Sequence, residues 1–169
     1  MNAFKTGWHL IYTRPKQERK VSDQLLEKNI QTYLPLTRQR RKWSDRIKVI
    51  STPLFPSYLF AYVKSIYDYY DGISVEGSCY YVRTGKNPAI ISNEEIGYIK
   101  VIETNGVNLE VSDQLFTIGQ QLVIQQGPFA GLTCEVIQHK GKKRILVRVS
   151  ILQRSILADL PFTAFQLCG

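Results

Sequence analysis

The most apolar stretch of the chain predicts a strand with two different faces. It follows Pro53-Leu54-Phe55-Pro56, whose two prolines fit neither a helix interior nor a central strand and therefore indicate an entry turn. The strand is expected over residues 57–63. Side chains alternate along a strand, so Tyr58, Phe60 and Tyr62 share one face and aliphatic side chains share the other. The aromatic face can be either the wall of a core or a docking surface, and the pattern favours neither.

The rest of the first part of the chain mixes strand-like and helix-like patterns. Pro15 suits the first turn of a helix, and the Ser92-Asn93-Glu94-Glu95 capping box opens another. We expect further strands over 8–13, 32–36 and 80–83, helices over 15–29, 65–72 and 92–105, and a hairpin over 38–48. This order is typical of an α+β fold, with an antiparallel sheet and helices packed on one of its faces.

Beyond residue 114 the pattern is all β. Short strands are expected over 121–125, 133–139, 144–150, 155–159 and 163–167. Five such strands in so short a segment predict a small SH3-like β-barrel. Residues 104–114 are polar and lack a regular period, which predicts an interdomain linker. The expected organisation is a domain over 1–103, a linker over 104–114 and a barrel over 115–169.

Charge adds a candidate partner to this picture. The chain of 169 residues has a formal net charge of +8, which favours an acidic partner, with nucleic acid as the leading candidate. Residues 38–48 hold six basic residues, one acid and a tryptophan, a combination that serves phosphate binding and base stacking. A basic cluster also opens the first helix, where positive charge opposes the helix dipole. The candidate nucleic-acid residues are Arg14, Lys16, Arg19, Lys20, Arg40, Arg41, Lys42 and Trp43. The alternatives are a solvated helix face and a solvated hairpin with Trp43 packed on its own base.

Several classes of chemistry lack support in the sequence. There is no phosphate-binding glycine loop, no dinucleotide fingerprint and no zinc-protease motif, and the two histidines have no metal-ligand spacing. Three widely spaced cysteines give no disulfide framework, which fits a reducing cytoplasm. No apolar run reaches the length of a membrane span. We therefore expect a cytoplasmic protein that is not an enzyme, with no cofactor, metal or membrane contact.

Four motifs resemble a known family in both order and spacing. They are Trp8-His9-Leu10-Ile11-Tyr12, Pro53-Leu54-Phe55-Pro56-Ser57-Tyr58-Leu59-Phe60, Tyr81-Val82-Arg83-Thr84-Gly85 with Pro88-Ala89-Ile90-Ile91, and Gly127-Pro128-Phe129-Ala130-Gly131. Together they resemble the NusG/RfaH family of transcription elongation factors over nearly the whole chain. The resemblance implies an N-terminal NGN domain and a C-terminal KOW barrel, with Gly127, Pro128, Phe129 and Gly131 in the KOW turn. Cys134 stands where the family often has glycine.

The resemblance also implies partners. An aromatic-lined depression of the NGN domain would bind the clamp helices of RNA polymerase through Tyr12, Phe55, Tyr58 and Phe60, and basic residues would touch upstream or non-template DNA. The barrel would recruit a ribosomal protein or a termination factor, and the protein would act as a monomer. Where RfaH-like proteins contact the polymerase gate loop through His-Thr-Thr, this chain has Asp68, Tyr69 and Tyr70, so that contact would differ or be missing.

The expected function is to suppress pausing and termination in specific long operons. The basic hairpin suggests such a dedicated role. The pattern from Tyr80 to Ile91 resembles UpxY-type regulators of capsular polysaccharide operons. Two alternatives remain open at this point. One is a KOW-type RNA-binding protein of the ribosome or its assembly, and the other is a housekeeping NusG.

Overall fold

The computed structural model describes residues 4–117, 119–124 and 130–159. The chain divides into two compact units, Met1–Asn93 and Glu94–Gly169. No helix among the described residues is long and apolar enough to cross a bilayer.

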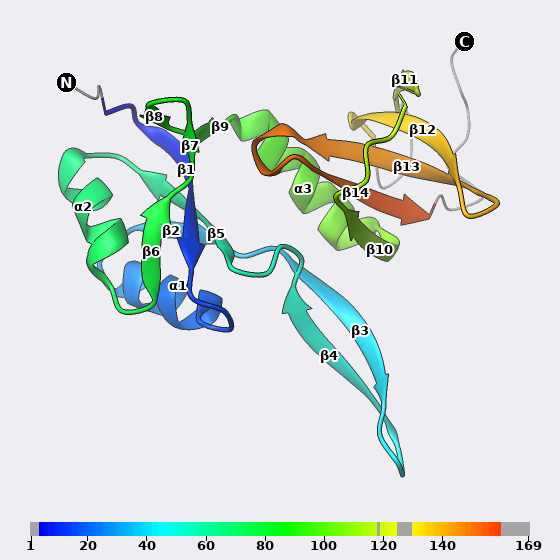
Figure 1. The fold of residues 1–169 in the computed structure, drawn as a ribbon, viewed down its shortest axis with the longest axis horizontal. Coiled ribbons are helices and arrows are strands. Elements are labelled where there is room, and N and C mark those ends of the chain that lie inside the picture. Colours follow the sequence, from blue (N-terminus) through cyan, green and yellow to red (C-terminus); the bar gives the residue numbers. More distant parts are fainter. Residues whose placement is uncertain (1–3, 118, 125–129, 160–169) are drawn as a thin grey trace. The chain divides into compact units, whose positions relative to one another are not determined.

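The first unit is built on a five-stranded antiparallel sheet. Its strands are β1 (Gly7–Thr13), β2 (Gln31–Tyr33), β5 (Tyr58–Val63), β6 (Ser78–Tyr81) and β9 (Ile90–Ile91). Their order is β2-β5-β1-β6, and β9 also pairs with β1 (Figure 1). The helices are α1 (Glu18–Glu27) and α2 (Ile66–Ser74). The strand predicted over 57–63 is confirmed, and it begins one residue later than expected.

One face of this sheet forms a core with α1. Ile11, Leu59 and Ala61 are fully buried and cluster with Val21 and Leu25 of the helix. Because side chains alternate, the opposite face of β1 and β5 carries Trp8, Leu10, Tyr12, Tyr58, Phe60 and Tyr62. The aliphatic and aromatic faces expected from the sequence are therefore present.

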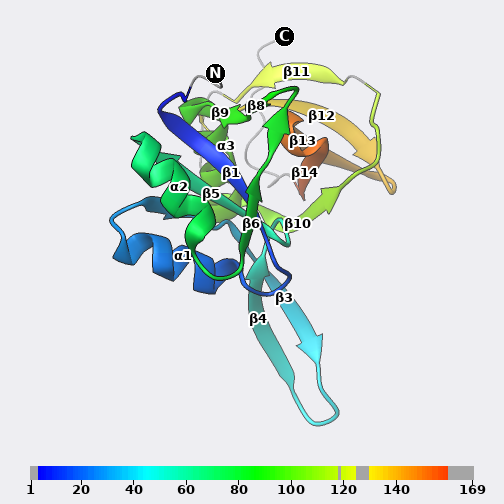
Figure 2. The same ribbon diagram turned by 60° about the vertical axis from the view of Figure 1, so that its left-hand side comes forward.

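Two hairpins extend the first unit. The long ribbon consists of β3 (Leu36–Lys42) and β4 (Ile47–Pro53), which pair along their whole length. Both views show it reaching away from the five-stranded sheet (Figures 1 and 2). The short hairpin consists of β7 (Arg83–Thr84) and β8 (Asn87–Pro88). The hairpin predicted over 38–48 is confirmed and is longer than expected.

The second unit holds a five-stranded antiparallel sheet of order β10-β14-β13-β12-β11. Its elements are α3 (Asn93–Asn105), β10 (Val107–Ser112), β11 (Gln120–Val123), β12 (Thr133–His139), β13 (Lys142–Val149), the 3-10 helix η1 (Ser150–Leu152) and β14 (Arg154–Asp159). Ile137, Leu146 and Leu157 form a buried cluster. Four of the predicted strands are present. The fifth, over 163–167, lies outside the described residues, and a closed barrel stays a prediction.

Two boundaries differ from expectation. Helix α1 begins at Glu18 instead of Pro15, because Lys16 has a left-handed φ of 63° that breaks the helical path. The predicted linker over 104–114 contains the end of α3 and strand β10. That strand exists because its backbone pairs with β14, with Val111 opposite Ile156. The partition into functional domains stays a prediction.

Candidate functional site

Three tyrosines from adjacent strands form a row on the aromatic face of the first sheet. Tyr12 pairs in register with Tyr58 on one side and with Tyr80 on the other. The Tyr12 and Tyr58 rings meet edge to face with centroids 5.4 Å apart, and the Tyr12 and Tyr80 rings stack at 5.0 Å. Tyr12 and Tyr58 are half-buried, and Tyr80 is 55% exposed. This tyrosine row presents ring edges and hydroxyl groups to a partner.

Tyr80 is a member of the row that the sequence did not single out. Desolvation, followed by the nearby Tyr12 and Tyr58, raises the pKa of Tyr80. Its hydroxyl therefore stays protonated near neutral pH and can donate a hydrogen bond. The available signal was the Tyr80-Tyr81 pair, since alternation along a strand must send one ring to each face.

The two phenylalanines predicted for the same site are buried. Phe55 is 1% exposed and Phe60 is 0% exposed. The Phe60 ring lies 6.3 Å from that of Phe55 and 5.9 Å from that of Tyr33. For these two residues the structure favours the core-wall reading, whereas Tyr12 and Tyr58 remain accessible. The interface role of all four stays a prediction.

A buried glutamate positions the start of β5. Glu18 is 5% exposed, and its carboxylate accepts a hydrogen bond of 2.7 Å from the backbone N–H of Ser57, which has a left-handed φ of 67°. The carbonyl of Ser57 accepts in turn from the N–H of Thr13 at 2.8 Å. These bonds fix the turn that delivers Tyr58 beside Tyr12. The sequence did signal this residue, because Glu18 continues the buried helical spacing of Val21, Ser22 and Leu25.

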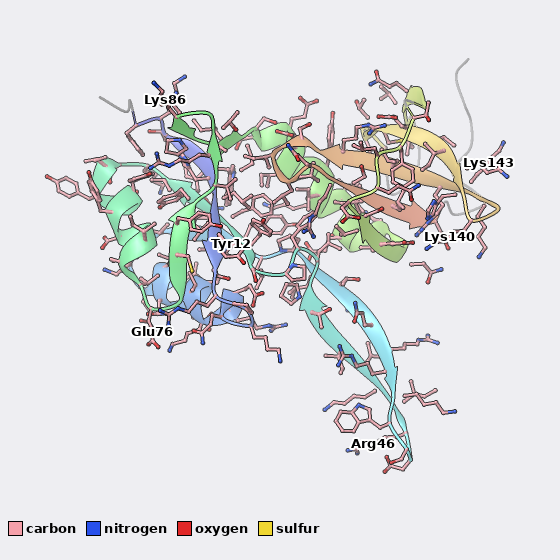
Figure 3. All side chains as sticks on the ribbon, in the orientation of Figure 1. Tyr12, Arg46, Glu76, Lys86, Lys140 and Lys143 are labelled. Carbon is pink, nitrogen blue, oxygen red and sulfur yellow. The ribbon has the colours of Figure 1, made fainter. Side chains whose placement is uncertain are left out.

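The predicted basic cluster around the start of α1 is partly neutralised. Lys20 forms a 2.7 Å salt bridge with Glu76, which Figure 3 labels. Lys20 and then Arg14 hold the pKa of Glu76 below its ordinary value. The Arg19 guanidinium donates to the carbonyl of Ser51 at 3.3 Å. The cluster thus contains its own carboxylate, which reduces its attraction for phosphate.

The ribbon β3–β4 carries a denser and less balanced charge. All of its basic residues are exposed, and among the residues that the structure describes no salt bridge joins them to a carboxylate. Trp43 is 57% exposed at the turn, where its backbone N–H donates to the Arg46 carbonyl at 2.8 Å. Figure 3 shows Arg46 at the far end of the ribbon. The exposed ring is evidence against the alternative in which Trp43 packs on the base of the hairpin.

Register places like charges opposite each other on this ribbon. Arg41 faces Lys48, and the neighbouring pairs set Arg40 against Val49 and Lys42 against Ile47. Like charges across a strand pair destabilise it, and a two-stranded ribbon has little stability to spare. Val49 and Ile47 are themselves exposed. A bound polyanion would relieve the repulsion, so the arrangement suits a nucleic-acid surface.

The predicted gate-loop residues have three different environments. The Asp68 carboxylate caps α2 by accepting from the N–H groups of Lys64 at 2.9 Å and Ser65 at 3.1 Å. Although desolvation opposes the change, these bonds lower the pKa of Asp68. The Tyr69 ring is half-buried and stacks on Tyr81 at 4.3 Å. Tyr70 is exposed and Asp68 is half-buried, and the gate-loop contact of these three residues stays a prediction.

The predicted KOW turn is only partly described. Gly127, Pro128 and Phe129 lie outside the described residues. Gly131 has a φ of +84°, a conformation that favours glycine, and its N–H donates to the Ile124 carbonyl at 2.8 Å. The next strand contains Cys134, which is buried, and burial raises its pKa to about 11.

No metal centre is found within the part of the chain that the structure describes, because no three histidine, cysteine or acidic side chains gather there in a suitable group.

Comparison with known proteins supports the assignment suggested by the motifs. A family model described as "Transcription termination factor nusG" matches residues 6–100. The solved structure titled "Domain interaction in Thermotoga maritima NusG" is 19% identical, covers 92% of this chain and 94% of that one, and has a TM-score of 0.52. It supports the fold. A crystal structure of an MjSpt4:Spt5 complex is 14% identical, covers 90% of this chain and 99% of that one, and has a TM-score of 0.35, too low to carry an argument.

Proposed function

Because this chain belongs to the NusG family of transcription factors, we propose that it is an elongation and antitermination factor that acts on RNA polymerase. In this proposal the first unit binds the clamp helices of the largest polymerase subunit. It also touches nearby DNA, and together these contacts suppress pausing and termination in specific long operons. The protein acts by binding, as a cytoplasmic monomer, without catalysis or a cofactor.

The observation that carries the proposal is the tyrosine row. Tyr12, Tyr58 and Tyr80 come from three strands and expose aromatic surface, although Leu10 and Phe60 on the same face of the sheet are buried. Tyrosine is enriched among residues that dominate binding energy, since it combines a large ring with a hydrogen-bonding tip. The row therefore fits a helical partner that buries the rings and accepts from the hydroxyl groups.

The DNA contact is assigned to the ribbon in preference to the start of α1. Residues 38–48 combine six basic residues with a single acid, and among the described residues no carboxylate pairs with their cations as Glu76 pairs with Lys20. The exposed Trp43 adds a stacking surface for an unpaired base. Upstream duplex or the displaced non-template strand would offer such phosphates and bases.

We propose further that the second unit is a KOW barrel that recruits another factor, a ribosomal protein or a termination factor. This part of the proposal rests on the resemblance of residues 127–131, since the family match ends at residue 100. A dedicated role, such as service to capsular polysaccharide operons, rests on the basic hairpin and the motif near Tyr80. A reporter whose readthrough depends on an operon-specific factor would distinguish this role from housekeeping activity.

The test is a binding measurement with purified RNA polymerase. Replacing Tyr58 by alanine should weaken binding by about 1–3 kcal/mol, because the change removes an accessible anchor from the row. Tyr67→Ala is the matched control, since Tyr67 is 80% exposed but lies on α2. Phe60→Ala is unsuitable because its ring is buried and truncation would damage the core.

Circular dichroism should show that both variants keep the wild-type fold. Equal binding by wild type and a folded Tyr58→Ala variant would contradict the proposed interface. Capture of ribosomal subunits instead of polymerase would overturn the transcriptional assignment of this surface and favour the RNA-binding alternative.

A further inference from the structure

A cavity of about 600 Å³ lies within the first unit, away from the tyrosine row. Its lining comes from α2, the segment around the start of β1, and the short hairpin β7–β8. His9, which lines it, occupies an odd position of β1 and therefore projects to the face opposite Tyr12. The cavity and the proposed polymerase site consequently lie on opposite faces of the sheet.

The wall of the cavity is apolar and accessible. Ile66, Tyr70, Ile73 and Ile90 line it, and each is an exposed large hydrophobic side chain. Scattered exposed hydrophobic residues need no explanation, but four gathered around one concavity mark a binding site. The volume falls within the range of small-molecule sites, which are lined mainly by apolar and aromatic groups.

Aromatic rings form the deeper part of the lining. The Phe4 ring stacks on His9 with centroids 6.4 Å apart and meets Tyr69 edge to face at 6.3 Å. His9 is buried and donates through Nε2 to the Lys5 carbonyl at 2.8 Å. Burial lowers the pKa of His9, so the ring is neutral at pH 7. This part of the lining therefore suits a flat apolar body.

The charges in the lining are of one sign. Lys5 and Arg83 line the cavity from different segments, both are exposed, and neither forms a salt bridge with a carboxylate among the described residues. None of the lining residues is acidic. Within the described part of the chain, the Arg83 guanidinium donates to the Lys86 carbonyl over a long distance of 3.5 Å. The two cations can therefore turn toward an anionic group of a ligand.

We propose that this cavity binds a small organic anion with an aromatic or flat apolar body. The body packs against the rings and isoleucines, and Lys5 and Arg83 neutralise the acidic group at the opening. This inference does not depend on the proposed clamp-helix contact of the tyrosine row, because it concerns the opposite face of the sheet and a different class of ligand. Tyr69 and Tyr70, two of the residues predicted to face the polymerase gate loop, do line the cavity.

The experiment uses three compounds that share a naphthalene body and differ in charge: 2-naphthoate, 2-naphthamide and 2-naphthylmethylammonium. Each is titrated into the full chain while amide chemical shifts are followed. We expect saturable shifts in α2 and around β7–β8, with affinity falling from anion to amide to cation. The two ends of the series should differ by about tenfold or more at low salt, and the difference should shrink as salt screens the cations.

A pair of variants isolates the role of charge. Arg83→Gln should weaken 2-naphthoate severalfold while leaving 2-naphthamide unchanged. Lys86→Gln is the matched control, because this substitution also removes one positive charge. Lys86 lies in the turn of the same hairpin but does not line the cavity. Figure 3 labels Lys86.

Three results would overturn the proposal. One is the absence of saturable shifts with all three compounds, which would leave the cavity to a protein partner. Another is tightest binding of the ammonium compound, which would indicate an aromatic cage for cations. The third is an equal loss of 2-naphthoate affinity in Arg83→Gln and Lys86→Gln, which would show that the anion responds to the net charge of the protein and not to Arg83 in the cavity.

Discussion

The protein contains two cation-rich hairpins that use their charges differently. In β12–β13, Arg144 is 6% exposed, with one guanidinium nitrogen 2.7 Å from Glu110 and another 2.9 Å from Asp159. Arg148 of the same strand lies 2.6 Å from Glu135 and lowers the pKa of that carboxyl group. In the ribbon β3–β4, by contrast, the basic residues are exposed and Arg41 faces Lys48.

The difference separates cations that hold a sheet together from cations that are available to a partner. β12–β13 lies inside a five-stranded sheet, and its arginines connect β13 to β10, β12 and β14. The ribbon has no flanking strand in its two-stranded sheet. Counting basic residues along the sequence cannot make this distinction, because it depends on where the carboxylates lie in space.

The largest expected effect comes from Arg144→Met. Removing the buried guanidinium takes a hydrogen-bond donor from Glu110 and from the carbonyl of Asn108, and an ion-pair partner from Asp159. We expect a loss of about 3 kcal/mol in the free energy of unfolding of the second unit, measured by denaturant titration. Arg40→Met on the ribbon is the control, with an expected change below about 0.5 kcal/mol. Similar losses of unfolding free energy in both variants would contradict the proposed difference between the arginines of β13 and the exposed cations of the ribbon.

The next effect concerns DNA binding. Replacing Arg40, Arg41 and Lys42 together by glutamine should flatten the dependence of log affinity on log salt by up to about 2.7, near 0.9 for each lost phosphate contact. Fluorescence anisotropy with a forked duplex at several salt concentrations measures this slope. The matched control replaces Lys140, Lys142 and Lys143 by glutamine at the other turn, where Figure 3 labels Lys140 and Lys143.

Both triple variants lower the net charge by the same amount, so a general charge effect would change both slopes equally. If the variant with Lys140, Lys142 and Lys143 replaced flattened the salt dependence more than the ribbon variant did, the nucleic-acid site would be assigned to the second unit. An unchanged slope in the ribbon variant would reject the assignment of the ribbon.

The sequence predicted those features that local patterns determine. The strand Thr133–His139 was expected with the ends that the structure has, and the strand Tyr58–Val63 was expected with a start one residue earlier. The helix expected over 65–72 is present as α2, and the Ser65 hydroxyl caps its start by accepting from the N–H of Asp68 at 3.2 Å. These elements follow from alternation, β-branched composition and capping chemistry, all of which act over a few residues.

The features that the sequence did not predict depend on contacts between distant segments. β10 was missed because a polar stretch becomes a strand only when β14 pairs with it. Tyr80 was missed because its place in the tyrosine row depends on β6 lying beside β1. The burial of Phe60 against Tyr33 requires β2 beside β5. Strand order is set by the whole fold, so a local pattern can place one ring of the Tyr80-Tyr81 pair on each face but cannot say which strand lies beside it.

The smallest expected effect tests the cross-strand repulsion itself. Lys48→Glu changes a like-charge pair with Arg41 into an opposite-charge pair. We expect the ribbon to gain a few tenths of a kcal/mol, up to about 1, because opposite charges across strands stabilise a pair that like charges weaken. Amide hydrogen exchange of the β3 and β4 N–H groups measures the gain, while DNA affinity should fall.

Lys48→Gln separates relief of repulsion from new attraction and should give an intermediate protection. Lys142→Glu, whose register partner is His139, should leave exchange in the ribbon unchanged. Protection and affinity that rise together in Lys48→Glu would show that the ribbon binds DNA through its rigidity, and not through the excess charge that distinguishes it from β12–β13.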